Sequence, residues 1–433
     1  MLTSTDLLTK RRFLPLFVTQ VLGAFNDNLY KNAMVLFVVY AVYSSAEQEF
    51  WFSAVAQLLF TLPFVLFSAL SGQLADMRDK AQIIRYVKIA EIAIMVVGAT
   101  GLVLAKLGVA VHALAIPLLL LALFAMGLHS TFFGPIKYAI LPQHLERREV
   151  LAGTGLVEAG TYLSVLGGTI LAGWVAAEVA AVLVIVLAII GYVAGRQVPR
   201  APAQGLVEKI DFNILRSSIR VVKGSMEDAR VYYAILAISF FWTIGAVLFL
   251  IFPPLAKNVL TASKEVASLF LVVFSIGVAI GSVSINALLK GDVSARFAPV
   301  SVLVMGAFVL MFYLVCRAWV PHDGLYGVME FIQLPLAPAL LLSLLGISIA
   351  GGMFVVPLYA FLTTVVDKSQ TARAVAANNL VNSLSMVAGA VVAIGLGFVV
   401  SIVDQLLLAA AMCLISAWLG WVLYKVELRL MPA

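Results

Sequence analysis

Long apolar runs recur along the whole chain, and short polar stretches separate them. A helix needs about 20 apolar residues to cross a hydrocarbon core of roughly 30 Å, so each run predicts one membrane-spanning helix. Transmembrane strands would instead alternate apolar and polar positions over about ten residues, and the runs lack this alternation. We predict twelve spanning helices, at residues 13–43, 50–71, 83–105, 113–136, 150–175, 178–195, 232–256, 266–289, 297–318, 332–358, 373–400 and 402–424.

The composition is typical of an integral membrane protein, because 63% of the residues are hydrophobic, 12% are charged and the mean hydropathy is +1.07. If the N-terminus lies inside, most of the 28 Lys and Arg residues fall in cytoplasmic segments, and the outer segments hold only Lys106, Lys257, Lys264 and Arg317. The positive-inside rule therefore predicts that both termini are cytoplasmic. The net charge of +6 reflects this topology and gives no reason to expect nucleic acid as a partner.

A polar segment between the sixth and seventh runs divides the chain. We predict an N-terminal six-helix bundle at 1–194, a cytoplasmic linker at 195–231 and a C-terminal six-helix bundle at 232–433. In the linker stretch "KIDFNILRSSIRVVKG", helical spacing places basic and apolar residues on different sides of the helix. The basic residues are Arg216, Arg220 and Lys223, and the apolar residues are Ile214, Leu215, Ile219 and Val222. This pattern predicts a basic amphipathic helix on the inner membrane surface, and a solvated linker is the alternative.

The two halves share a sequence pattern. "GPIKYAIL" (134–141) precedes "GLVEAGTYLSVLGG" (155–168), and "VPLYAFL" (356–362) precedes "NLVNSLSMVAGA" (379–390). Recurrence of Pro, Tyr-Ala and Leu-Val at a similar spacing predicts two pseudo-symmetric halves, with chance similarity of apolar helices as the alternative.

The stretch "GQLADMRDK" (72–80) carries several charges between two runs. It resembles the signature of the major facilitator superfamily, although one glycine of that signature is missing and the basic positions are shifted by one. We expect Gly72 to allow a tight turn, Asp76 to accept bonds from a helix N-terminus, and Arg78 and Lys80 to bind carboxylates or lipid phosphates. The resemblance implies a twelve-helix major facilitator fold, in which this loop is a gating latch. An ordinary charged loop is the alternative.

The first run contains the polar stretch "AFNDNLYKN" (24–32). Asp27 lies about 21 Å along this helix, close to the bilayer midplane. Asp27, Asn28, Lys31 and Asn32 share an arc of about 140°, which must face a cavity or another helix because charge facing lipid at this depth is costly. The stretch therefore predicts substrate binding or gating, and the alternative is an internal pair of Asp27 and Lys31 that braces the helix.

Three stretches resemble the bacterial lysophospholipid transporter family: "FLPLFVTQVLGAFNDNLYKNA" (13–33), "FFGPIKYAILPQH" (132–144) and "GLVEAGTYL" (155–163). The likeness is greatest to the transporter portion of proteins that fuse it to an acyltransferase and an acyl-carrier-protein synthetase. It implies inward transport of lysophospholipid across the bacterial inner membrane, by alternating access, for reacylation on the cytoplasmic side. Asp27, Lys137 and Glu158 are the positions that match the family's motifs.

These residues suit a zwitterionic headgroup, which needs an anion for its amine and a cation for its phosphate. We expect Asp27 and Glu158 to meet the amine, and Lys137 and Lys31 to meet the phosphate; snorkelling to membrane phosphates is the alternative for Lys137. The matching positions in the run at 373–400 are polar but uncharged: Asn378, Asn379 and Asn382.

Enzymatic chemistry finds little support. The four histidines lack the His-x4-Asp spacing of glycerolipid acyltransferases, and no P-loop sequence occurs. Cys316 and Cys413 lie within predicted helices and suggest no thiolate metal site, so we expect no cofactor. Unlike those fusion proteins, this sequence ends directly after the last predicted helix, so we expect any acyltransferase partner to be a separate protein. An exporter of drugs or other amphiphiles, and a non-transporting scaffold for an acyltransferase, remain the alternatives.

Overall fold

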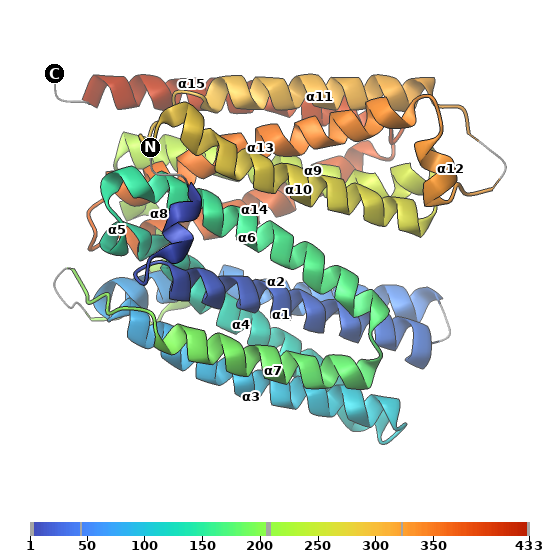
Figure 1. The fold of residues 1–433 in the computed structure, drawn as a ribbon, viewed down its shortest axis with the longest axis horizontal. Helices are drawn as coiled ribbons and strands as arrows, with labels where there is room; N and C mark the ends of the chain where they lie inside the picture. The colour runs from blue at the N-terminus through green and yellow to red at the C-terminus, as the bar shows by residue number, and fades with distance from the viewer. Residues whose placement is uncertain (1–3, 44–45, 205–208, 322–323, 431–433) are drawn as a thin grey trace. The chain divides into compact units, whose positions relative to one another are not determined.

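The structure is a computed structural model that describes residues 4–43, 46–204, 209–321 and 324–430 (Figure 1). Twelve long helices run through these residues, which confirms the predicted all-helical architecture. They are α1 (Leu14–Phe37), α2 (Ala46–Met77), α3 (Lys80–Lys106), α4 (Ile116–Ala139), α6 (Arg147–Trp174), α7 (Ala177–Arg196), α9 (Ala229–Asn258), α10 (Lys264–Leu289), α11 (Ala298–Ala318), α13 (Ala337–Val365), α14 (Thr371–Leu396) and α15 (Gln405–Leu430).

Eleven helical segments of the described chain are long and apolar enough to cross a membrane. The first helix, α1, is not among them, because its polar stretch at 26–32 lowers its hydropathy. Shorter α-helices are α5 (Leu141–His144), α8 (Ile214–Ser225) and α12 (Val328–Ile332), and the described residues also form a 3-10 helix at Ser4–Thr9 and π-helices at Val38–Val42 and Val111–Ala115. The predicted helix at 332–358 begins later than expected, at Ala337, because Pro335 lies between α12 and α13 and proline disfavours helical geometry in the residue before it.

The chain forms two compact units. The first unit contains residues 1–146, 163–224 and 366–380, and the second contains residues 147–162, 225–365 and 381–433. These units differ from the predicted linear parts in three ways: the start of α6 groups with the second unit, the start of α14 groups with the first, and the predicted linker at 195–231 is divided between the units after Gly224. Each of these two helices therefore contributes residues to both units.

In the first unit, α3 packs against both α4 and α7, α1 packs on α7, and α2 packs on α4 (Figure 1). Tyr30 of α1 lies at the centre of this core, where it is fully buried and its hydroxyl donates to the Leu119 carbonyl at 2.9 Å. Gly98 of α3 leaves room for the Tyr30 ring, since a Cβ there would lie 2.5 Å from a ring carbon. This packing sets the depth of the polar face of α1.

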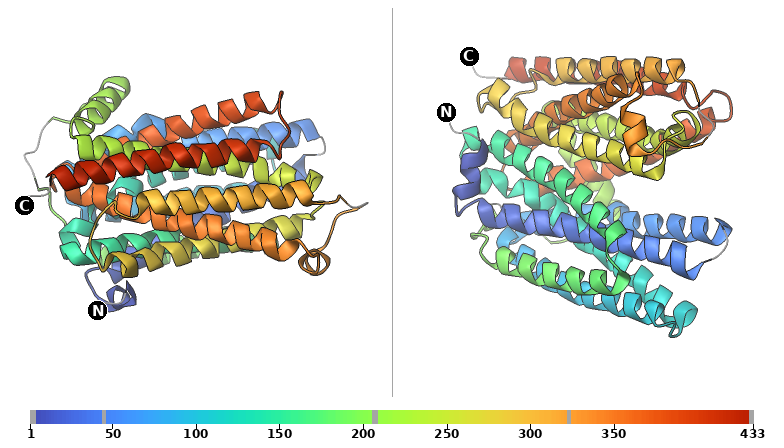
Figure 2. Two further views of the ribbon diagram at one scale, coloured as in Figure 1. Left: turned by 90° about the horizontal axis from the view of Figure 1, so that it is seen from above. Right: turned by 45° about the vertical axis from the view of Figure 1, so that its right-hand side comes forward.

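In the second unit, α13 packs against both α10 and α11, and α15 packs against α9 and α11 (Figure 2). Apolar side chains fill these contacts, including Phe312 of α11 and Phe354 of α13. The indole N–H of Trp242 on α9 donates to the Tyr359 hydroxyl on α13 at 3.0 Å. This bond satisfies two polar groups that would otherwise be costly within an apolar bundle.

Candidate substrate-binding site

The carboxylate of Asp27 joins α1 to α4. The Ser130 hydroxyl donates to Asp27 Oδ2 at 2.5 Å, and the side chain is half-buried. Its second oxygen, Oδ1, is shielded from solvent and has no hydrogen-bond partner among the described residues. One oxygen of this acid is thus fixed, and the other is left able to accept a donor.

The neighbouring polar residues of α1 have local partners. Lys31 Nζ lies 5.2 Å from the centroid of the Phe60 ring on α2. Asn28 donates to the Ala24 carbonyl at 2.8 Å, and Asn32 donates to the Thr169 hydroxyl of α6 at 3.1 Å. Asp27 and Lys31 form no ion pair in the part of the chain that the structure describes, so the alternative of an internal brace lacks its direct contact.

A buried charge cluster adjoins Asp27, and the sequence analysis missed it. We define it as Lys88 and Glu91 of α3, His129 of α4 and Asn26 of α1, all of which are buried. Glu91 Oε2 lies 2.5 Å from Lys88 Nζ and 3.2 Å from His129 Nε2. Asn26 Nδ2 donates to Glu91 Oε1 and to the Val184 carbonyl of α7, both at 3.1 Å.

The buried charge cluster is linked to Asp27 by chain neighbours. Asn26 precedes Asp27 on α1, and His129 precedes Ser130 on α4, so α1 and α4 each carry one residue of the cluster directly before one residue of the Asp27–Ser130 contact. Gly23 makes room for the cluster, because a Cβ there would lie 2.7 Å from Lys88 Nζ. The signal that could have found it is the pair of charges three residues apart inside the predicted run at 83–105.

Lys137 lies in the last turn of α4, half-buried, with Nζ 4.8 Å from the centroid of the Tyr138 ring. One turn earlier, Gly134 faces α14, and its Cβ position lies 3.6 Å from Asn379 Nδ2. The neighbouring Asn378 is fully buried, and its amide atoms have no hydrogen-bond partner within the described residues. The structure thus brings the predicted Asn379 beside the "GPIK" stretch that carries Lys137.

Two predicted residues belong to the second unit. Glu158 is buried on α6, with 2% of its surface exposed. Asn382 of α14 is also buried, and its Oδ1 accepts a hydrogen bond from the Ser239 hydroxyl of α9 at 2.6 Å.

The predicted latch residue Asp76 caps α14. Asp76 Oδ1 accepts from the Ala372 N–H and Oδ2 from the Arg373 N–H, both at 2.9 Å, as expected for a carboxylate at a helix N-terminus. The Arg373 guanidinium lies 3.9 Å from the same carboxylate. All three residues lie in the first unit, so this capping contact joins α2 to the start of α14.

The expectations for Gly72 and Lys80 need correction, whereas that for Arg78 stays a prediction. Gly72 does not form a turn, because α2 continues to Met77; it lies instead where a Cβ would be 2.6 Å from the Ala376 Cβ, so it allows α2 to approach α14. Lys80 is fully buried at the start of α3 and its Nζ has no hydrogen-bond partner in the described chain. Arg78 is exposed and donates to the Met77 carbonyl at 3.4 Å.

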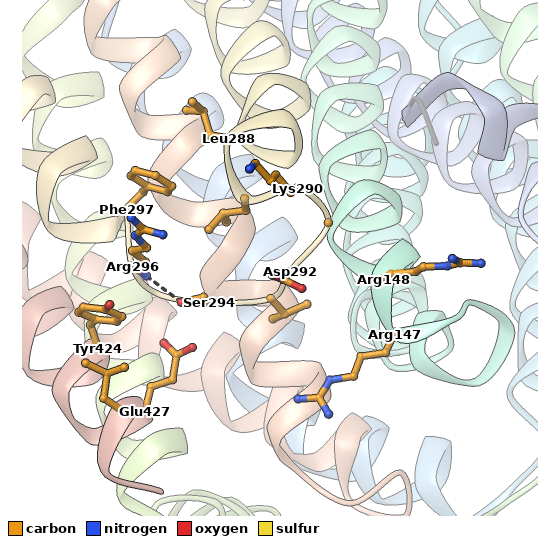
Figure 3. A pocket seen from close by; sticks show the side chains of 14 residues that line it. Arg147, Arg148, Leu288, Lys290, Asp292, Ser294, Arg296, Phe297, Tyr424 and Glu427 are labelled. Carbon is orange, nitrogen blue, oxygen red and sulfur yellow. Dashed lines mark hydrogen bonds between the residues drawn. The ribbon is translucent and has the colours of Figure 1, made fainter. Parts of the chain in front are cut away.

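A cavity of about 610 Å³ lies in the second unit, and no predicted site residue lines it (Figure 3). Its wall includes Arg147 and Arg148 of α6, the segment between α10 and α11, and Glu427 of α15. Figure 3 shows Arg148 pointing away from Arg147, so these two guanidinium groups do not converge on one point. Glu427 Oε2 accepts from the Ala295 N–H at 2.9 Å, which ties α15 to this segment.

Comparison with known proteins agrees with this architecture. Residues 16–390 match the family model of the Major Facilitator Superfamily. The chain belongs to this superfamily. As a superfamily member it is a multi-pass membrane protein of a transporter family. Among curated relatives, it is 27% identical over 403 residues to the lysophospholipid transporter LplT of Shigella boydii and to that of Escherichia coli, covering 88% of this chain and 90% of each relative.

Solved structures show the same superfamily fold. A bacterial homologue of the iron transporter ferroportin, in an outward-facing state, matches with a TM-score of 0.71 and 13% identity over 97% of this chain and 100% of that chain. The human organic anion transporter MFSD10 matches with a TM-score of 0.68 and 12% identity over 96% of this chain and 98% of that chain. At these identities the likeness concerns the fold alone.

Proposed function

We propose that this chain is a lysophospholipid transporter that moves its substrate inward across a bacterial inner membrane by alternating access. The similarity to LplT proteins over 88% of the chain supports the substrate class. In this proposal both termini are cytoplasmic and the chain catalyses no reaction itself. A separate acyltransferase on the cytoplasmic side consumes the lysophospholipid and so maintains its inward flow.

The observation that carries the proposal is the arrangement of Asp27. A carboxylate at this depth is costly unless it has partners, and Asp27 Oδ1 has none among the described residues. An ethanolamine ammonium carries three N–H donors and a full positive charge, so it can satisfy this oxygen while Ser130 holds the other. Asp27 therefore suits the amine of lysophosphatidylethanolamine.

Lys137 suits the phosphate. It lies on α4 seven residues beyond Ser130, which corresponds to a rise of about 10 Å along the helix. The helix that fixes Asp27 thus also carries a cation, and the amine and phosphate of a headgroup each find a partner along it. Lys31, Asn28, Asn32, Glu158, Asn378, Asn379 and Asn382 stay predicted contacts.

The direct test is uptake by purified protein in lipid vesicles. We expect radiolabelled lysophosphatidylethanolamine to cross the bilayer faster than in protein-free vesicles, and an imposed proton gradient in a parallel sample reports on energy coupling. Binding without crossing would favour a scaffold. Transport of unrelated amphiphiles in preference to lysophospholipids would favour a drug exporter.

Replacement of Lys137 tests the phosphate contact. Lys137→Ala should reduce transport of every lysophospholipid, because all of them carry the phosphate. Lys137→Arg should retain part of the activity, since the charge is kept while the donor geometry changes. Normal transport by the alanine variant would leave Lys137 with a snorkelling role only.

A further inference from the structure

The linker helix α8 presents two exposed rows of side chains. Phe212, just before the helix, is 75% exposed, Leu215 is 72% exposed and Ile219 is 60% exposed. At 100° per residue Leu215 and Ile219 lie about 40° apart on α8, and the exposed Phe212 lies in the segment directly before the helix. The opposite side carries Ser217, Ser218 and Val221, which are buried.

A basic row lies beside the apolar row. Arg216, Arg220 and Lys223 occupy the adjacent arc of about 60°, and all three are exposed. A solvated linker gains nothing from an exposed apolar row, whereas a helix at a lipid surface can bury such a row at the acyl boundary. Apolar and basic rows side by side are the arrangement of a helix that lies in the interface of an anionic membrane.

A clamp around Asp211 fixes the orientation of α8. Arg216 donates from Nε and Nη2 to the two Asp211 oxygens, both at 2.8 Å, and Arg220 Nη1 lies 3.5 Å from Oδ2. The Asp211 N–H donates to Gln73 Oε1 of α2 at 3.1 Å, which ties the clamp to a spanning helix. The Arg216 and Arg220 side chains are still 65% and 68% exposed, so their donors stay accessible to a further anion.

The chain also places α8 at the membrane. Only residues 226–228 separate its end at Ser225 from the start of α9, a helix that is long and apolar enough to span the bilayer. The four Cα–Cα steps from Ser225 to Ala229 span about 15 Å at most, so the C-terminal end of α8 lies within that distance of the start of this spanning helix. The predominance of basic residues in the predicted cytoplasmic segments makes this the inner surface.

We propose that α8 binds the anionic inner leaflet, with Phe212, Leu215 and Ile219 at the acyl boundary and Arg216, Arg220 and Lys223 on lipid phosphates. Anionic phospholipid is the partner that fits, because it is the surface that offers apolar chains and negative charge next to each other. This binding is independent of the transported molecule.

The test measures where Leu215 lies in the full-length protein in vesicles. A Leu215→Cys variant, with Cys316→Ala and Cys413→Ala to remove the buried thiols, is labelled with an environment-sensitive fluorophore. Lipids brominated in their acyl chains should quench this label at least threefold more than a label at Gln204→Cys, an exposed linker position. Equal quenching at both positions, or equal access of aqueous iodide to both, would overturn the proposal.

Charge reversal tests the anionic partner. Adding phosphatidylglycerol to phosphatidylcholine vesicles should increase the acyl-chain quenching at position 215, and the double change Arg220→Glu with Lys223→Glu should abolish this increase. Lys209→Glu, which changes an exposed linker cation outside the helix, is the control and should leave the increase intact. An increase that survives the double reversal would refute the phosphate contacts. These experiments measure the position of α8 and not transport. Their outcome is therefore independent of whether the proposed transport function holds or fails.

Discussion

Asp27 and the buried charge cluster show how a polar residue is tolerated within an apolar bundle. Each carboxylate is held by a neighbour on another helix: Asp27 by Ser130 of α4, and Glu91 by His129 of α4 and Asn26 of α1, with Lys88 of its own helix as a further partner. The two carboxylates differ in how many of their oxygens have a partner. Both Glu91 oxygens have partners, whereas Asp27 Oδ1 has none among the described residues, so the two acids should respond differently to substitution.

Asp27→Asn should change headgroup preference. The amide keeps the size of the side chain but removes the charge, so transport of lysophosphatidylethanolamine should fall more than that of lysophosphatidylglycerol, which has no amine. A charge-assisted bond contributes roughly 1.5–3 kcal/mol, which corresponds to a change in preference on the order of tenfold to a hundredfold. Competition transport assays with the two lipids measure this ratio.

The same variant separates headgroup recognition from bracing. If Asp27 serves only to neutralise Lys31, transport of both lipids should fall equally, and Lys31→Met added to Asp27→Asn should restore it. That pattern of equal loss and rescue would contradict the proposed contact with the amine.

Glu91→Gln should destabilise the protein, because it leaves the fully buried Lys88 without a counter-charge. Removing one partner of a buried pair costs about 3–5 kcal/mol, whereas replacing both with apolar residues of similar size is often nearly neutral. The double variant Lys88→Met with Glu91→Leu should therefore recover most of the loss in thermal unfolding of the detergent-solubilised protein. Glu178→Gln, at an exposed position on α7, is the control. Equal unfolding temperatures for Glu91→Gln and this control would show that the pair contributes little.

At the scale of the helices, α2 connects three features through one face of its last turns. Gly72 permits close approach to α14, Gln73 accepts a bond from Asp211 of the linker, and Asp76 caps α14. The sequence indicated Asp76 as an acceptor for a helix N-terminus. It did not indicate that the helix would be α14, because the contact joins residues almost 300 positions apart.

Asp76→Asn should impair the transport cycle more than substrate binding. An amide has one acceptor oxygen instead of two and no charge, and loss of a helix cap costs about 0.5–2 kcal/mol. Such a change shifts a two-state equilibrium by about twofold to thirtyfold, and affinity changes only through the competent fraction. Transport rate and equilibrium binding of lysophosphatidylethanolamine should be measured on one preparation. Abolished binding by a folded variant would contradict a latch.

The clamp on α8 should be insensitive to pH across the physiological range. Hydrogen bonds from Arg216 lower the pKa of Asp211 to about 2. A lowered pKa means that the clamp's contribution is complete above the ordinary aspartate value, near pH 4, and is lost as the pH falls towards 2. A nitroxide at Lys223→Cys, in the cysteine-free background, should show constant mobility from pH 8 to 5. Adding Asp211→Asn should raise that mobility throughout this range, and no change would argue against the clamp.

At the scale of the whole molecule, hydropathy predicted the architecture because the membrane requires apolar helices of one length. The high average hydropathy of the run at 83–105 also explains why the sequence analysis missed Lys88 and Glu91, because two charges change the average of a long apolar run very little. Polar stretches also continue helices, so the predicted loop at 72–80 is helical as far as Met77. Nor could the sequence predict that the compact units divide α6 and α14, because this division depends on contacts between distant segments.

The capping of α14 has a consequence for genetics. Asp76 binds main-chain N–H groups of residues 372 and 373, and every residue except proline supplies such a group. The two hydrogen bonds therefore do not depend on the side chain at either position. The fully buried Ala372 is restricted by packing and not by this contact, whereas the Arg373 guanidinium lies 3.9 Å from the carboxylate, so any covariation with Asp76 should appear at position 373. For the same reason, a selection for second-site suppressors of Asp76→Asn should recover few substitutions at Ala372, where only the main chain participates. Suppressors should instead map to positions that stabilise the same conformation by other means.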